Sequence, residues 1–163
     1  MVWLLVFHRV EDPTISYSAV STGPLALSIF LCYRLIYMNE KTVLIIEDEA
    51  DAAELFAEMM RVSGFRVLKT FSSAPAMDLI VSERPDIIIL DIMMPDKSGL
   101  DILREVHSDP TLATIPVIDV SAKSLPADIK LGMDAGAFTY LTKPVGFLEL
   151  KEAVMDALGS QAA

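Results

Sequence analysis

The sequence has very little of the two side chains that most often hold transition metals or cross-link a small fold. Cys32 is the only cysteine, so no disulfide can form within the chain, and a reducing compartment is compatible with this composition. His8 and His107 are the only histidines, which excludes a zinc site built from several imidazoles. At 163 residues, the chain is long enough to be stabilised by one hydrophobic core.

Basic residues are also scarce. The chain has 13 Lys and Arg against 23 Asp and Glu, which gives a formal net charge of -10. A nucleic-acid-binding domain would show clustered Lys and Arg and a basic balance, so nucleic acid is not an expected partner. The acidic balance instead favours a partner with a positive surface, or a bound cation.

Long apolar runs are missing as well. "MVWLLVF" and "LALSIFLCYRLIY" are both shorter than the roughly 20 residues that span a bilayer, and no basic region precedes the first. We therefore expect a cytoplasmic protein with no membrane partner. The charges within residues 1–37 cancel, and we interpret this segment as an N-terminal extension outside the working fold, with Met38 as the natural start. An interfacial membrane segment is the alternative. Residues 38–163 are then one domain.

From Lys41 onward, short apolar runs alternate with amphipathic segments of helical length. This alternation is typical of a parallel sheet covered by helices. The run "DIIILD" is the most apolar and should lie at the centre. The sequence predicts a doubly wound α/β domain: a five-stranded parallel sheet in the flavodoxin-like order 2-1-3-4-5, with helices on both faces. The expected strands are 42–46, 65–71, 86–91, 115–122 and 137–143, and the expected helices are 48–64, 73–84, 98–109, 126–136 and 146–159.

Acidic residues stand where the first and third expected strands end. Glu47 and Asp48 follow the first strand, and Asp91 ends the third. In open parallel sheets, ligands bind beyond the carboxyl ends of the strands where the strand order reverses, so these carboxylates should share one pocket. Crowded like charges are costly unless a cation neutralises them, and an all-oxygen ligand set favours Mg²⁺.

Polar groups also end the other two strands beside this point. Ser121 ends the fourth strand and Lys143 the fifth. A hydroxyl, an ammonium and a divalent cation around one carboxylate make a receptor for phosphoryl oxygens. Asp91 would then be the nucleophile that forms an aspartyl phosphate.

The segments "IIEDE", "ILDIMMPDKSG", "VSAK" and "LTKP", in this order and spacing, resemble the receiver domain of two-component response regulators. The resemblance covers residues 40–158. It implies that Asp91 is the phosphoacceptor, that Glu47 and Asp48 are the acidic pair of a Mg²⁺ site, and that Met93 lends its backbone carbonyl to the metal.

The same resemblance implies a switch. Ser121 matches the switch hydroxyl, Lys143 the lysine that contacts the phosphate, and Tyr140 the aromatic residue that changes rotamer on activation. It also makes the bond between Lys143 and Pro144 a candidate for the cis form.

The function that follows is that of a stand-alone receiver. It would accept a phosphoryl group from a phosphohistidine of a sensor histidine kinase or a histidine phosphotransfer protein. It would signal to a downstream target protein through the face made by the fourth helix, fifth strand and fifth helix. No conventional enzyme is expected, only Mg²⁺-dependent self-phosphorylation and autodephosphorylation.

Two alternatives stay open. A receiver-like interaction module that works without phosphorylation would not depend on Mg²⁺. A phosphatase similar to the haloacid dehalogenases would need a second Asp two residues after the nucleophile, and Met93 stands there.

Two residues depart from the family pattern. Asp119 lies inside the fourth expected strand and should share a face with Ser121. The Asp119 carboxylate must be paired, hydrated or neutral, and Lys123 is a candidate partner. The negative charge of Asp119 could also add to that of the acidic pocket. Met93 cannot orient water by hydrogen bonding, so we expect slow self-dephosphorylation.

Overall fold

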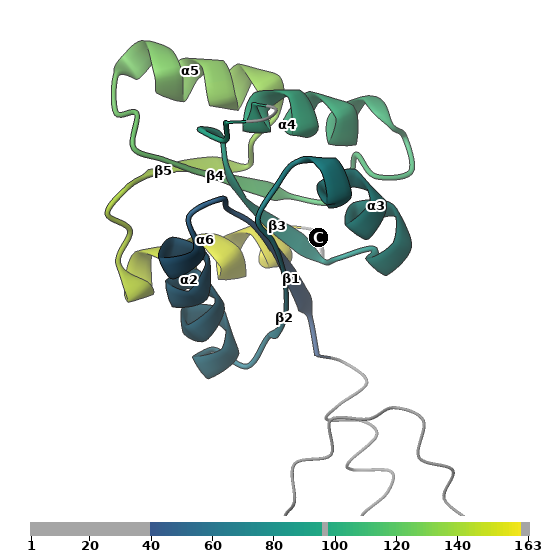
Figure 1. Cartoon of the computed structure of the whole chain (residues 1–163), viewed down its shortest axis with the longest axis vertical. Coiled ribbons are helices and arrows are strands. Elements are labelled where there is room, and N and C mark those ends of the chain that lie inside the picture. The colour runs from purple at the N-terminus through teal and green to yellow at the C-terminus, as the bar shows by residue number, and fades with distance from the viewer. Residues whose placement is uncertain (1–39, 96–97, 161–163) are drawn as a thin grey trace, which may run out of the picture. The chain divides into compact units, whose positions relative to one another are not determined.

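The computed structural model describes residues 40–95 and 98–160, in which strands and helices alternate (Figure 1). The strands are β1 (Thr42–Ile46), β2 (Arg66–Thr70), β3 (Ile87–Asp91), β4 (Val117–Ser121) and β5 (Thr139–Thr142). The helices are α2 (Ala50–Val62), α3 (Ala74–Glu83), α4 (Gly99–Ser108), α5 (Pro126–Ala135) and α6 (Phe147–Ser160). The extension assigned to residues 1–37 lies outside the described residues and stays a prediction.

The five strands form one parallel sheet in the order β2-β1-β3-β4-β5. This confirms the predicted doubly wound fold, with β3 at the centre. Four strands begin later than expected, β2 and β3 by one residue and β4 and β5 by two. The Phe65 amide still donates to the Met60 carbonyl of the α2 C-terminal turn, so β2 starts at Arg66. Pro116 has no amide hydrogen to add to the ladder, and β4 starts at Val117.

Alternation along the strands divides the core into two layers. In β1, Val43 and Ile45 pack on one face of the sheet, whereas Leu44 and Ile46 pack on the other. Helices α2 and α6 cover the first face, and α3, α4 and α5 lie on the second (Figure 1). Because β1, β3 and β4 are buried along their whole length, their positions in the sheet are fixed by packing on both sides.

A glycine brings the start of α4 against the end of β3. A Cβ at Gly99 would lie 2.4 Å from the Asp91 carbonyl oxygen and 2.6 Å from the Ile92 Cα. These are backbone atoms, which cannot rotate away as a side chain can. The amide of Gly99 also donates to the Ile92 carbonyl oxygen at 3.3 Å. The close approach therefore holds the loop that follows Asp91.

We expect Gly99→Ala to lower the free energy of unfolding by about 1–3 kcal/mol, because the added methyl group overlaps backbone. The matched control is Gly159→Ala in the last turn of α6, where a Cβ would have no neighbour within 4 Å. Urea denaturation of both variants measures the effect. Equal stability of the two variants would contradict the close approach at Gly99.

Candidate functional site

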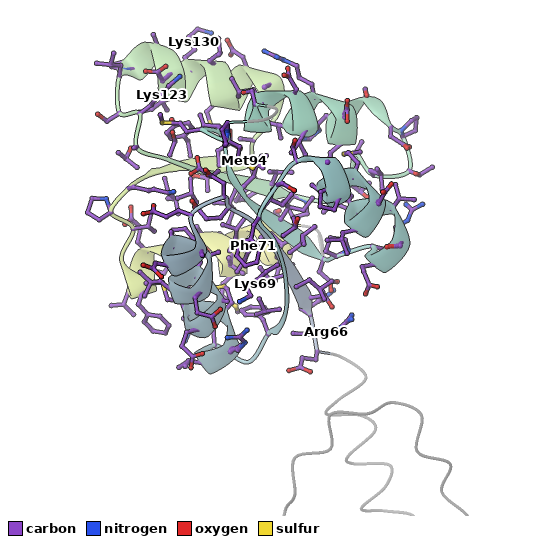
Figure 2. All side chains as sticks on the ribbon, in the orientation of Figure 1. Arg66, Lys69, Phe71, Met94, Lys123 and Lys130 are labelled. Atoms are coloured by element: carbon purple, nitrogen blue, oxygen red, sulfur yellow. The ribbon has the colours of Figure 1, made fainter. Side chains whose placement is uncertain are left out.

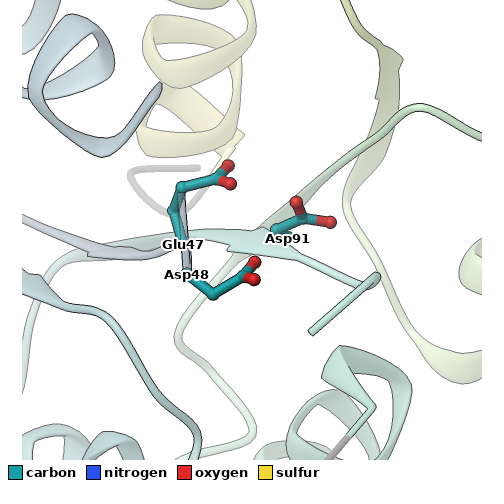
Figure 3. Close-up of side chains that lie close together, drawn as sticks. All are labelled: Glu47, Asp48 and Asp91. Carbon is teal, nitrogen blue, oxygen red and sulfur yellow. The ribbon is translucent and has the colours of Figure 1, made fainter. Parts of the chain in front are cut away.

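Three carboxylates meet where β1 and β3 end. Glu47 and Asp48 follow β1, Asp91 is the last residue of β3, and Ile46 pairs with Leu90 just before them. One carboxylate oxygen from each acid lies within 4.8 Å of the others (Figure 3). Glu47 is 1% exposed and Asp91 5% exposed, whereas Asp48 is open to solvent. The structure thus brings together the acids that the sequence predicted to share a pocket.

The ammonium group of Lys143 bridges two of these acids. Its Nζ donates to Glu47 Oε2 at 2.7 Å and to Asp91 Oδ2 at 2.6 Å. Lys143 follows β5, and its amide donates to the Ser121 carbonyl oxygen at 2.8 Å, which ties the end of β5 to the end of β4. The peptide bond between Lys143 and Pro144 is cis, as predicted. The lysine therefore belongs to the acidic pocket.

Burial and the charge of the partner act in opposite directions on the pKa values of Glu47 and Lys143. Burial raises the pKa of Glu47 to about 7, against the effect of the Lys143 ammonium, which lowers it; the charge of Asp91 raises it further. Burial lowers the pKa of Lys143, but its hydrogen bonds to Asp91 and Glu47 outweigh this and raise the pKa. The lysine stays charged at neutral pH, whereas Glu47 can lose or gain a proton there.

The donor set of the pocket fits a hard divalent cation. Glu47 Oε1 is buried and has no hydrogen-bond partner among the described residues, and Asp48 adds an exposed carboxylate. Oxygen-only ligands with access to water are what Mg²⁺ prefers. The Met93 amide donates to Asp91 Oδ1 at 2.7 Å, so the backbone of Met93 lies directly beside this carboxylate. The role of its carbonyl as a metal ligand stays a prediction.

The two predicted switch residues are joined through one backbone segment. Ser121 is fully buried at the end of β4, and its Oγ accepts from the Lys123 amide at 3.2 Å. The Tyr140 hydroxyl donates to the Lys123 carbonyl oxygen at 2.9 Å. In the pairing of β3 with β4, Asp91 lies opposite Val120, one residue before Ser121. Ser121 is thus placed at the same edge as the acids.

The interpretation of Asp119 needs correction. Asp119 is fully buried, and neither carboxylate oxygen has a hydrogen-bond partner among the described residues. The proposed pairing with Lys123 is wrong, because Lys123 Nζ lies 4.0 Å from Asp128 Oδ1 instead. Asp119 is not one of the clustered acids; it points towards Gly132, where a Cβ would lie 2.7 Å from Asp119 Oδ2. Strand alternation sends this side chain beneath α5, away from solvent.

Gly132 is a site residue that the sequence interpretation missed. A glycine inside an otherwise helical segment was the available signal, since it costs helix stability and usually has a packing reason. Here the reason is the close approach of α5 to β4 and β5. A Cβ would also lie 2.9 Å from Tyr140 Cδ2.

The fold and the pocket at the ends of its strands define a doubly wound α/β domain with a cluster of three acidic side chains. Residues 43–155 match the family described as response regulator receiver domain. The chain is 33% identical over 119 residues to the polar-differentiation response regulator DivK of Brucella anthropi, which covers 73% of this chain and 97% of that protein. The chain belongs to the response regulator receiver domain family, which serves two-component systems.

Solved structures agree with this assignment. A response regulator receiver domain protein from Clostridium thermocellum has 29% identity and a TM-score of 0.70, covering 75% of this chain and 97% of that one. The signal receiver domain of a signal transduction histidine kinase from Syntrophus aciditrophicus has 30% identity and a TM-score of 0.69, covering 74% and 91%. Within residues 40–95 and 98–160, the structure contains no helix that is long and apolar enough to cross a membrane.

Mg²⁺ affinity should depend on pH through Glu47. Because the pKa of this carboxyl is raised to about 7, a proton competes with the metal below that pH. We expect the affinity to fall by up to about tenfold between about pH 8 and about pH 6. Calorimetric titration with MgCl₂ measures the change.

Two variants test the source of this dependence. Glu47→Gln should bind Mg²⁺ more weakly and lose most of the pH dependence, whereas Glu49→Gln, at an exposed neighbouring acid, should keep it. An unchanged pH dependence in Glu47→Gln would assign the titration to another group.

Proposed function

We propose that this chain is a phosphoacceptor receiver: it takes a phosphoryl group onto Asp91 from a phosphohistidine of a sensor histidine kinase or a histidine phosphotransfer protein. The observation that carries the proposal is the contact of Lys143 Nζ with Asp91 Oδ2 at 2.6 Å, inside a cluster of three carboxylates. An ammonium and a cation site beside one buried carboxylate stabilise a phosphoryl group as it is transferred.

Transfer would be a direct displacement. A carboxylate oxygen of Asp91 attacks phosphorus and forms an O–P bond, while the P–N bond of the phosphohistidine breaks. The electron pair stays on the imidazole nitrogen, which takes a proton from solvent. Lys143, whose Nζ donates to Asp91 Oδ2, would orient the carboxylate and contact the phosphoryl oxygens. Glu47, Asp48, Asp91 and the Met93 carbonyl would hold Mg²⁺, which supplies positive charge for the phosphoryl oxygens when bound.

The signal would leave through the face of α5, β5 and α6. Ser121 and Tyr140 both bond to the Lys123 backbone, so a movement of Ser121 towards a phosphoryl group would be felt by Tyr140. Lys123 and Lys130 lie at the α5 end of the domain (Figure 2). Exposed apolar side chains of α5, α6 and the residues that precede α5 and β5 are available to a downstream protein: Leu125, Leu131, Met133, Phe138, Phe147, Leu148 and Met155. We predict a cytoplasmic location, where such partners present their phosphohistidines.

Two other functions are less well supported. An interaction module that works without phosphate has no need of a partly buried lysine in contact with two buried acids, and this chain has one. A haloacid-dehalogenase-like phosphatase needs an acid two residues after the nucleophile. Met93 stands there, and it is 48% exposed.

Acetyl phosphate and Mg²⁺ should add one phosphoryl group to the full chain, because the pocket holds both the nucleophile and the charges that stabilise its transfer. Intact mass spectrometry measures the gain. Asp91→Asn should show none, whereas Asp101→Asn, at a half-exposed acid of α4, should react like the wild type. Equal phosphorylation of Asp91→Asn, or a gain that does not need Mg²⁺, would contradict the proposed site.

Hydrolysis of the aspartyl phosphate should be slow, since the apolar Met93 side chain beside Asp91 cannot orient water. Met93→Asn should speed it. One new hydrogen bond of about 1 kcal/mol in the transition state corresponds to roughly fivefold. The loss of phosphoprotein over time, followed by mass, gives the rate. Met155→Asn, at a similarly exposed methionine of α6, is the control. A Met93→Asn rate equal to that of the wild type would disprove the role.

A further inference from the structure

The receiver chemistry makes no use of Asp119, the acid on the second face of the sheet. Its neighbours across the sheet are Leu90 on β3 and Tyr140 on β5. Gly132 of α5 closes over it, with space for a hydrogen but not for a methyl group beside Asp119 Oδ2. The carboxyl is therefore enclosed between the sheet, the Tyr140 ring and the α5 backbone.

A carboxylate in this place cannot stay charged without cost. Neither oxygen has a hydrogen-bond partner among the described residues, and a buried charge without a partner is strongly disfavoured. Burial raises the pKa of Asp119 to about 7, and the negative charge of Asp91 raises it as well. The neutral acid is the form that fits the enclosed site.

Among residues 40–95 and 98–160, the charged and titratable groups around Asp119 offer no compensating cation. Asp91 ends β3, Tyr140 lies opposite on β5, and Asp128 stands one turn before Gly132 on α5. The charges of Asp128, Asp119 and Asp91 all raise the pKa of the Tyr140 hydroxyl, after burial as the main cause. From α4, His107 packs at Gly136, one turn after Gly132, and its Nε2 is buried with no hydrogen-bond partner in the described part of the chain.

We propose that Asp119 is a proton-linked positioning residue: α5 and Tyr140 pack over its neutral form, and negative charge added at Asp91 draws a proton from solvent onto it. The inference rests on the proposed phosphorylation of Asp91. An acyl phosphate carries more negative charge than the carboxylate that it replaces, so the ionised form of Asp119 becomes still less favourable. Phosphorylation and proton uptake are then coupled.

The coupling would act on the proposed switch. In the ionised form, the unpaired charge of Asp119 lies opposite Tyr140 in the pairing of β4 with β5, and the cost of burying that charge opposes closer packing of the ring over it. In the neutral form, that cost is gone. The phosphorylated domain therefore holds Tyr140 and α5 in place only when Asp119 has taken up its proton, and the switch becomes more complete as pH falls through the neutral range.

Proton uptake can be measured with a stable mimic of the phosphoryl group. The full chain is titrated with beryllium fluoride at fixed Mg²⁺ and about pH 7.5, in two buffers with different enthalpies of ionisation. The difference in heat gives the number of protons taken up on binding. We expect the wild type to take up about half a proton more than Asp119→Asn, which keeps the shape of the side chain but cannot titrate.

A matched variant and a second measurement make the test decisive. Asp134→Asn removes an exposed charge from α5 and should behave like the wild type. If Asp119→Asn does not fold, carboxyl NMR of the wild type labelled with ¹³C at aspartate decides. One carboxyl should titrate near pH 7 and move to higher pH with beryllium fluoride.

The outcomes separate the two proposals. Binding of beryllium fluoride with equal proton counts in wild type and Asp119→Asn overturns the coupling alone. So does an NMR titration in which the aspartate midpoints other than that of Asp91 stay unchanged on binding. If the folded wild-type chain does not bind beryllium fluoride at all, the proposed phosphoacceptor function fails and the coupling fails with it.

Discussion

The site depends on one ammonium group placed between two buried carboxylates. Lys143 Nζ lies 2.7 Å from Glu47 Oε2 and 2.6 Å from Asp91 Oδ2, and it joins the ends of β1, β3 and β5. Strand β5 is two strands away from β3 in the sheet, so the lysine reaches past β4 to make this contact. Without the cation, the buried acids would repel each other, and removing one partner of a buried ion pair is strongly destabilising. The strand order therefore determines the electrostatics of the site.

The Lys143 ammonium keeps its contacts with the two acids because the surrounding backbone is rigid. Strands β1, β3 and β4 are buried throughout, and Gly99 fits α4 against the backbone at Asp91 with no space for a methyl group. A reacting carboxylate on such a rigid strand keeps its position while the charge on it changes. The pocket is rigid on its inner side, whereas Asp48 and Met93 leave its outer side open to solvent and ligands.

The sequence was sufficient for the fold and for the acidic pocket, because both follow from rules with a fixed geometry. Apolar runs that alternate with amphipathic segments specify parallel βα units, and the carboxyl ends of parallel strands share one edge. The surroundings of Asp119 were not predictable. Lys123 was a reasonable partner by sequence distance, but its ammonium approaches Asp128, and the depth of Asp119 depends on how closely α5 packs at Gly132. Such contacts arise from tertiary packing, which periodicity does not encode.

Two buried acids, one on each side of the central strand, have pKa values raised towards neutral pH. The charge of Asp91 raises the pKa of both. Glu47 has an ammonium group to offset its burial, whereas Asp119 has no hydrogen-bond partner among the described residues; the pKa of each is raised to about 7. A change of charge at Asp91 therefore reaches both core layers electrostatically, before any side chain moves. On the side of Glu47, the Lys143 ammonium can compensate added negative charge by shifting its hydrogen bonds between Glu47 and Asp91. On the side of Asp119, only a proton or a movement of Tyr140 and α5 can do so, and we propose that this face of the domain is the one that responds.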